Sequence, residues 1–257
     1  MTVGRRRLDR RARAALVVLG ALVLAAILVP PLATDPLGHW HLLGTDAFGR
    51  DLFTRMMLAS RVSLLVGFAG SLLAGLAGIA VGAVAAWAGG VVDRVTMAVS
   101  DTLLAIPRLV LLLVAAALWP PGAVMVVLIL TATGWMGVAR LVRAEVLGVR
   151  THAYVEAAHA LGARSRRVLW RHVLPNALGP AIVAITLGVG SAILLESGLS
   201  FLGLGIQPPN PSWGNMIADG REAIVMAPWA ALAPGLALIA TVTCCTLLGD
   251  SLSDAGA

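Results

Sequence analysis

Six long apolar stretches, separated by short polar segments, dominate the pattern of hydrophobic and polar positions along the chain. Roughly 20 helical residues cross the hydrocarbon core of a bilayer, which is about 30 Å thick, so each stretch predicts a membrane-spanning helix. The predicted spans are residues 14–32, 62–87, 95–119, 123–142, 178–199 and 229–248. The pattern therefore predicts an all-α membrane protein with six transmembrane helices.

The segments outside the predicted spans are too short to form a further domain. Residues 34–61, 143–177 and 205–228 are each shorter than the roughly 40 residues below which a chain seldom folds alone. No soluble catalytic domain is therefore expected. The expected organisation is an arginine-rich tail with the first span and an outer segment, then a transmembrane domain, then a short tail, at residues 1–61, 62–249 and 250–257.

Small residues recur at helical spacing along the second predicted span. They are Gly67, Ser71, Gly75, Gly78 and Gly82. Such a stripe lets two helix backbones approach closely in lipid. It predicts a helix interface, within this chain's own bundle or with another subunit, and packing within the bundle is the simpler interpretation.

The arginine residues predict the orientation of the chain. All 19 basic residues are arginine, and an inside N-terminus places fourteen of them on the cytoplasmic side and four outside, with Arg108 within a span. Because basic residues accumulate in cytoplasmic loops, both termini are predicted to be cytoplasmic. The arginines gather in two short segments rather than over a folded soluble face, which argues against a nucleic-acid partner.

Residues that several classes of enzyme site require are missing from the sequence. Without lysine there is neither a P-loop nor a Schiff-base site. Cys244 and Cys245 are adjacent, so they form no Cys-x-x-Cys motif, and neither a His-Glu-x-x-His nor a Gly-x-Ser-x-Gly motif occurs. We expect no catalytic site and no cofactor in this chain, which would act in the membrane or through a partner.

The predicted cytoplasmic loop, residues 143–177, contains two short helices. Thr151 is the predicted N-cap of the first helix, which Gly162 ends, and the second runs over 165–174 until Pro175 stops it. Two uses remain open for this pair of helices. It can dock into a groove on another protein, or it can lie on anionic membrane lipid.

The two faces of the first loop helix differ in character. One carries Val155, Ala158 and Gly162, and the other carries His152, Glu156 and His159. The second set includes a Glu-x-x-His pair, which can bind metal where several helices supply ligands. A single exposed helix has no second set of ligands, so no metal site is expected.

The same loop resembles the EAA motif of binding-protein-dependent ABC importer permeases. The matching residues are Glu156, Ala157, Ala158, Gly162, Leu174 and Pro175. Other segments are similar to the dipeptide, oligopeptide and nickel branch of that family, in the family's order. They are Leu43-Gly44-Thr45-Asp46, Gly49-Arg50-Asp51, Ser200 to Pro209, Ser212-Trp213-Gly214 and Asp219-Gly220-Arg221, so the resemblance extends over residues 43–250.

The resemblance implies a multi-pass permease of the cytoplasmic membrane whose last five spans form the common importer core. Its implied partners are a second similar permease, two ATPase subunits that hold ATP and Mg, and an extracytoplasmic solute-binding protein. The family's coupling role falls on Glu156, Ala157, Ala158 and Gly162. The implied function is import of short peptides by alternating access, which residues 171–176 favour over the alternative of nickel or another small solute.

Asp101, Arg108 and Glu196 lie well inside predicted spans, where charge is costly and usually functional. These residues are therefore candidates for the transport pathway, or for hydrogen bonds within the bundle. In an ion-coupled secondary transporter, the competing hypothesis, they would form a relay. Arg108 follows Pro107 near the predicted membrane centre, where it either lines the pathway and favours solutes that bear a carboxylate or pairs with an acid.

The last outer segment, residues 205–228, is rich in proline. Pro208, Pro209 and Pro211 stiffen it after Gln207, and Trp213 offers an amphipathic anchor. We expect this segment to face the solute-binding protein or the mouth of the pathway.

Overall fold

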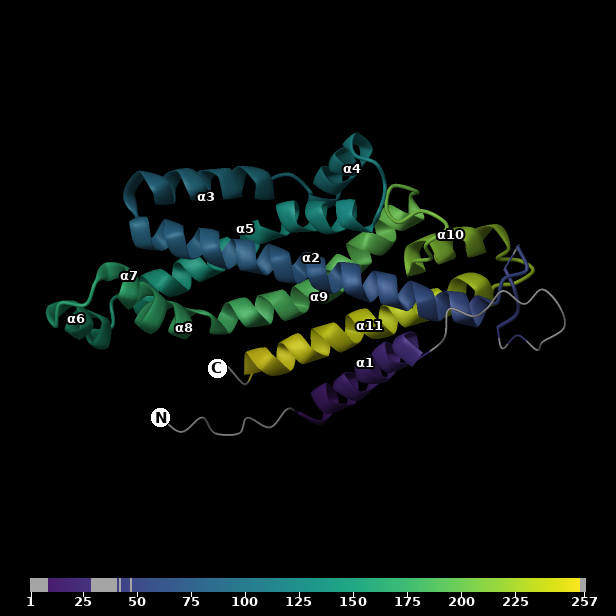
Figure 1. Cartoon of the computed structure of the whole chain (residues 1–257), viewed down its shortest axis with the longest axis horizontal. Helices are drawn as coiled ribbons and strands as arrows, with labels where there is room; N and C mark the ends of the chain where they lie inside the picture. Colours follow the sequence, from purple (N-terminus) through teal and green to yellow (C-terminus); the bar gives the residue numbers. More distant parts are fainter. Residues whose placement is uncertain (1–8, 29–40, 42, 47, 255–257) are drawn as a thin grey trace.

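The computed structural model is helical throughout the elements it describes, within residues 9–28, 41, 43–46 and 48–254. The long helices run along one axis and form an elongated bundle (Figure 1). In chain order the helices are α1 (Arg10–Leu28), α2 (Leu52–Ala88), α3 (Gly90–Leu104), α4 (Arg108–Leu118), α5 (Ala123–Val149), α6 (Ala153–Ala160), α7 (Ser165–Val168), α8 (Leu174–Ala177), α9 (Gly179–Phe201), α10 (Trp213–Glu222) and α11 (Trp229–Asp254). A π-helical turn, Leu169–Val173, joins α7 to α8.

Four helices, α2, α5, α9 and α11, are long and apolar enough to cross a membrane, and α3 with α4 makes five if that bent pair is one span. α1 corresponds to the first predicted span, whose end at residues 29–32 lies outside the described residues, as do residues 33–40, 42 and 47 of the segment after it and residues 255–257. The all-α fold is as predicted. The number of six spans and the cytoplasmic termini stay predictions.

The third predicted span is not one straight helix. α3 and α4 meet at an angle of 89°, with the break between Leu104 and Arg108. Pro107 has an extended ψ of 123° and no N–H to donate, so the helical hydrogen bonds cannot continue through it. Depth in the membrane therefore cannot be counted along a single axis to Arg108.

α2 and α5 are longer than the apolar pattern predicts, as is α11, which continues to Asp254. α2 begins at Leu52, ten residues before its predicted start, because Asp51 caps its first turn by accepting a hydrogen bond from the Thr54 N–H at 2.8 Å. α5 continues to Val149, through what was predicted as the start of the loop. The predicted cytoplasmic loop is therefore limited to residues 150–178, and we call it the coupling loop after the role that the resemblance implies.

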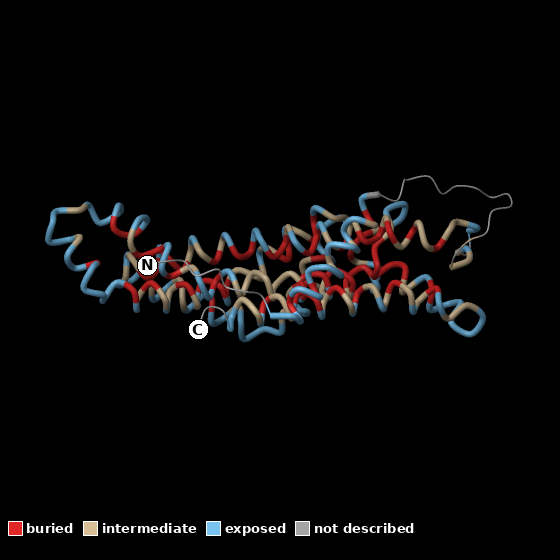
Figure 2. The backbone as a smooth tube through the Cα atoms, turned by 90° about the horizontal axis from the view of Figure 1, so that it is seen from below, coloured by how far each residue is buried: buried red, intermediate tan, exposed pale blue. Residues whose placement is uncertain are grey.

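The small-residue stripe of α2 packs within this bundle, as predicted. A Cβ atom at Gly78 would lie 2.6 Å from the Trp135 carbonyl oxygen of α5, and one at Gly67 would overlap the Ile193 side chain of α9. α2 is thus the central helix, with α5 and α9 against it. Figure 2 shows the buried positions running along the bundle, while the segment around α6 at one end is mostly exposed.

Candidate functional site

α6 projects from one end of the bundle and is fastened by one of its faces (Figure 1). Val155 is 2% exposed and packs in a cluster with Val146, Val168 and Val173, and Ala158 lies against the same cluster. Glu156 and Ala157, away from this cluster, are exposed. The helix therefore has one buried and one exposed face, as predicted, but Gly162, expected on the buried face, is exposed beyond the helix end.

Glu156 is available for an external contact. Within the described part of the chain its carboxylate forms neither a hydrogen bond nor an ion pair, although arginines are numerous in the coupling loop. Leu161, at the tip, is 89% exposed. An exposed acid beside an exposed leucine is a combination that a complementary partner surface can bind, by charge at its rim and apolar contact at its centre.

Gly162 makes the turn that ends α6. Its φ is +80°, a conformation that L side chains rarely adopt, and its N–H donates to the His159 carbonyl at 2.9 Å. The N–H of Ala163 donates to the Ala158 carbonyl at 3.1 Å, which closes the helix end. No atom lies within 4 Å of a Cβ built on Gly162. The backbone conformation therefore favours glycine here, and the space beside it is open.

Two predicted boundaries in this loop are wrong. His152, not Thr151, is the N-cap residue of α6, and the Thr151 hydroxyl donates instead to the Gly148 carbonyl at the end of α5. Pro175 does not stop the second loop helix, because it occupies the first turn of α8, where a missing N–H costs little. The π-helical turn before it leads the chain from α7 into α8 without a break.

Trp87, at the end of α2, anchors the coupling loop. Its indole N–H donates to the Ser165 hydroxyl at 3.0 Å, and its ring stacks on His159 with centroids 6.3 Å apart. The Arg150 guanidinium lies 5.9 Å from the same ring centroid.

His152 contacts the carbonyls of its own chain at 3.1 Å, and the described residues contain no group of three His, Cys, Asp or Glu that could hold a metal ion.

A basic hollow lies beside the tip of the loop. It has a volume of about 630 Å³ and is lined by Gly162, Ala163, Arg164, Arg166, Arg167 and Trp170. Trp170 is 61% exposed, so an aromatic ring and three guanidinium groups face the same open space. The loop thus presents an apolar and charged surface around a rigid turn.

The opposite end of the bundle is closed by a network of charges centred on Asp46. Its carboxylate accepts hydrogen bonds from the side chains of Arg50 and Arg55, each at 2.7 Å, and from the backbone N–H groups of Phe48 and Arg50. Arg55 also contacts Asp219 of α10 at 3.3 Å. Arg55 therefore joins the segment before α2 to α10, two segments that the family resemblance singled out separately.

The network is expected to make the protein sensitive to acid. Burial raises the pKa of Asp46, but the hydrogen bonds from Arg50 and Phe48 and the charge of Arg55 lower it by more, so the net pKa is below the usual range. A carboxyl whose folded-state pKa is lowered stabilises the fold above its unfolded pKa, near 4, and loses this effect as pH falls further. The melting temperature in detergent should therefore fall less steeply with decreasing pH below about pH 4 for Asp46→Asn than for the wild type. Asp250→Asn, an exposed control, should behave as the wild type.

Glu196 is fully buried near the same end, where it is enclosed by serine hydroxyls. Ser63 and Ser200 donate to its carboxylate at 2.9 and 2.7 Å, and Ser197 lies at 3.3 Å. The Ser63 hydroxyl oxygen also accepts a hydrogen bond from the backbone N–H of Trp213, so these contacts link α2, α9 and α10. Of the uses foreseen for Glu196, hydrogen bonding within the bundle is the one that this geometry matches.

Trp213 differs from its predicted position. It is fully buried, its indole N–H donates to Ser60 at 3.2 Å, and Ser212 before it caps α10. It therefore anchors α10 inside the bundle and cannot face a binding protein directly. Pro208 and Pro209 are exposed and Gln207 is partly exposed, so they remain candidates for that contact.

Arg55 was missed from the sequence because the apolar run places the start of the second span at residue 62, and Ser63 was missed because its partners, Glu196 and Trp213, lie on distant segments. The available signal is Ser60 and Ser63, which flank Arg61 and Val62 and, three residues apart, lie on one face of a helix. Such buried hydroxyls require partners, which here are Glu196 and Trp213.

Charged residues also occur along the middle of the bundle. Asp101 of α3 pairs with Arg140 of α5 at 3.1 Å, both side chains being more than half exposed, and Asp93 pairs with Arg143. Arg108 instead donates to the Thr133 hydroxyl at 3.4 Å and to the Leu130 carbonyl at 3.3 Å. The proposed pairing of Arg108 with an acid is therefore absent from the described residues.

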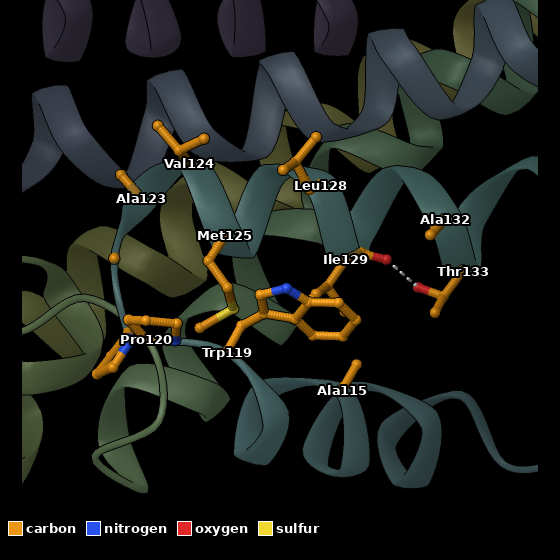
Figure 3. A pocket seen from close by; sticks show the side chains of 12 residues that line it. Ala115, Trp119, Pro120, Ala123, Val124, Met125, Leu128, Ile129, Ala132 and Thr133 are labelled. Atoms are coloured by element: carbon orange, nitrogen blue, oxygen red, sulfur yellow. Dashed lines mark hydrogen bonds between the residues drawn. The ribbon is translucent and has the colours of Figure 1, made fainter.

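An apolar hollow of about 750 Å³ lies between α4 and α5 (Figure 3). Trp119, Met125 and Leu128 line it, and Thr133 lies at one end, with its hydroxyl bonded to the Ile129 carbonyl. Because Thr133 also accepts from Arg108, the hollow adjoins the position of that charge.

Comparison with known proteins identifies this arrangement of helices. Residues 78–255 match the family described as binding-protein-dependent transport system inner membrane component. The chain belongs to this family. The permease is therefore a multi-pass protein of the inner membrane and a transport component without a catalytic role.

The permease is similar to proteins of several bacteria. It is 35% identical to the oligopeptide transport system permease protein OppC of Bacillus subtilis, over 97% of this chain and 86% of that protein. It is 44% identical to the probable peptide ABC transporter permease protein y4tQ of Sinorhizobium fredii, over 91% and 82%. Among solved structures, an inward-facing MetNI methionine ABC transporter superposes with a TM-score of 0.64 at 19% identity, over 80% of this chain and 96% of that one, which shows a shared fold.

Proposed function

We propose that this permease imports short peptides by alternating access, driven by ATPase subunits that dock on the coupling loop. The observation that carries the proposal is the identity of 35 to 44% with proteins named as oligopeptide or peptide permeases, over more than nine tenths of this chain. Nickel or another small solute is the alternative.

The geometry of the coupling loop supports the docking role. A loop that couples a partner's movement to the bundle must pack firmly against the bundle and expose a surface to the partner. Val155 and Trp87 fasten α6, whereas Glu156, Ala157 and Leu161 are exposed. Leu174 is buried in the same cluster as Val155. The EAA motif therefore contains both residues that hold the loop on the bundle and exposed residues that a partner can contact.

The proposed assembly contains this permease, a second similar permease, two ATPase subunits that hold ATP and Mg, and a solute-binding protein on the outer side. The exposed Pro208 and Pro209 and the partly exposed Gln207 lie at the opposite end from α6, which suits contacts with partners on the two sides of the membrane (Figure 1). An ion-coupled mechanism has less support, because Asp101, Arg108 and Glu196 have separate hydrogen-bond partners.

The proposal is tested by reconstituting the complete complex in proteoliposomes. Uptake of a labelled dipeptide or tripeptide should require ATP and binding protein, and should continue after an ionophore collapses the membrane potential. A nickel chelate offered in the same assay should not be taken up. Uptake that stops with the potential, or that favours the nickel chelate, would contradict the proposal.

A further inference from the structure

Arg108 is held within the bundle but has unused hydrogen-bonding capacity. A guanidinium has five N–H donors, and the two hydrogen bonds of Arg108 are long, at 3.3 and 3.4 Å. Its side chain reaches the α5 backbone because residue 134 is glycine, where a Cβ would lie 2.9 Å from Nη2. The guanidinium is therefore positioned by close packing, with donors left for another group.

No protein carboxylate neutralises this charge among the described residues. Asp93 and Asp101 pair with Arg143 and Arg140 of α5, and Glu196 is enclosed by serines. An unneutralised charge within a membrane-spanning bundle is costly, and such charges usually mark a pathway for ions or substrate. Arg108 is thus a positive charge with no acidic partner among the described residues, at the bend between α3 and α4.

A small cavity adjoins the guanidinium. Its volume is about 50 Å³, and its walls come from α2, α4, α5 and α9, with Ser71, Gly75, Gly134 and Gly188 among the lining residues. One bound water needs roughly 10–15 Å³ measured in this way, so the space holds a group the size of a carboxylate but not a whole peptide. The walls are mostly small, and the lining includes no acidic residue.

We propose that Arg108 binds the C-terminal carboxylate of the peptide in transit. The inference rests on the proposed function, because it takes the solute to be a peptide. A guanidinium binds a carboxylate through two parallel hydrogen bonds, which makes the pairing stronger and more specific than a neutral contact. Every unmodified peptide carries this carboxylate whatever its side chains, so one cation in the wall selects free-acid peptides as a class.

The experiment compares each peptide as the free acid and as the C-terminal amide, in the reconstituted complex with binding protein saturated by each form. The variants are Arg108→Gln, Arg108→Lys and the control Arg94→Gln, an exposed arginine of α3 that contacts only its own helix among the described residues. The wild type and Arg94→Gln should transport the free acid about tenfold faster than the amide, as expected for one charged hydrogen-bonded pair. Arg108→Gln should reduce that ratio to about one, and Arg108→Lys should retain part of it.

A second measurement removes the selectivity of the binding protein. Competition for a labelled peptide on the purified permease–ATPase complex should favour the free acid for the wild type and neither form for Arg108→Gln. A free-acid preference that persists in Arg108→Gln, or its loss in Arg94→Gln as well, would overturn the inference. So would competition by phosphate that is as strong as that of the peptide, because it would indicate a general anion site. A wild-type complex that imports neither form would overturn the proposed function itself.

Discussion

Gly162→Val is expected to lower ATP-driven uptake by about tenfold or more and to abolish its coupling to ATP hydrolysis. A non-glycine residue pays roughly 1–2 kcal/mol in the left-handed conformation, and a β-branched residue is worse placed still. With φ at +80°, valine must move the backbone that joins Leu161 to Ala163. The measurement is uptake beside substrate-stimulated ATPase activity in the same proteoliposomes.

Two further variants distinguish backbone strain at residue 162 from a clash with the docked partner as the cause of lost uptake. Gly162→Asn should keep most of the activity if conformation alone matters, because asparagine tolerates positive φ. If Asn fails as Val does, a partner's backbone must approach this position closely. Gly148→Val, at a glycine with open space and ordinary φ, is the control and should have little effect. Unchanged uptake and coupling in Gly162→Val would refute the docking role.

Gly214→Ala is expected to prevent stable folding of the end of the bundle that carries α10. A Cβ there would overlap the Ser197 carbonyl oxygen and lie 2.7 Å from the Ser197 Cα. Backbone atoms of α9 cannot swing aside as a flexible side chain can, so α10 must shift and Trp213 must leave its buried site. We expect a several-fold loss of assembled complex and a lower melting temperature in detergent.

Gly198→Ala provides the matched control for this effect. Gly198 follows Ser197 on α9, and nothing lies within 4 Å of the position that an added Cβ would take there. Alanine also favours a helix by about 1 kcal/mol over glycine, so stability should be unchanged or slightly higher. Equal melting temperatures for Gly214→Ala and the wild type would show that α9 and α10 are not held by this contact.

The features that sequence reasoning predicted are those that depend on local periodicity. Apolar length indicates the long helices, and the 3.6-residue repeat places Val155 on a buried face and Glu156 on an exposed one. The turn at Gly162 also follows from local chemistry, because glycine is the residue that positive φ favours. Each of these signals lies within about one or two helical turns of the residue concerned.

The features that were missed depend on contacts between distant segments. Trp213 is buried because Ser60, more than 150 positions earlier, supplies a partner for its indole N–H. Arg55 extends α2 beyond its apolar run because Asp46 and Asp219 neutralise its charge. A hydropathy pattern contains neither pairing, so it treats the tryptophan as a surface anchor and places the arginine in the outer segment before the span.

The π-helical turn at Leu169–Val173 has a consequence for the direction in which α6 points. Its wider turn, with the Leu174 N–H bonded to the Leu169 carbonyl, accommodates one residue more than an α-helix would. Deleting one residue here would restore the α-helical repeat and rotate everything before it by about 100° around the axis of α8. The number of residues in this turn therefore sets the direction in which α6 points. A single-residue insertion or deletion would change that direction without changing any side chain of the EAA motif.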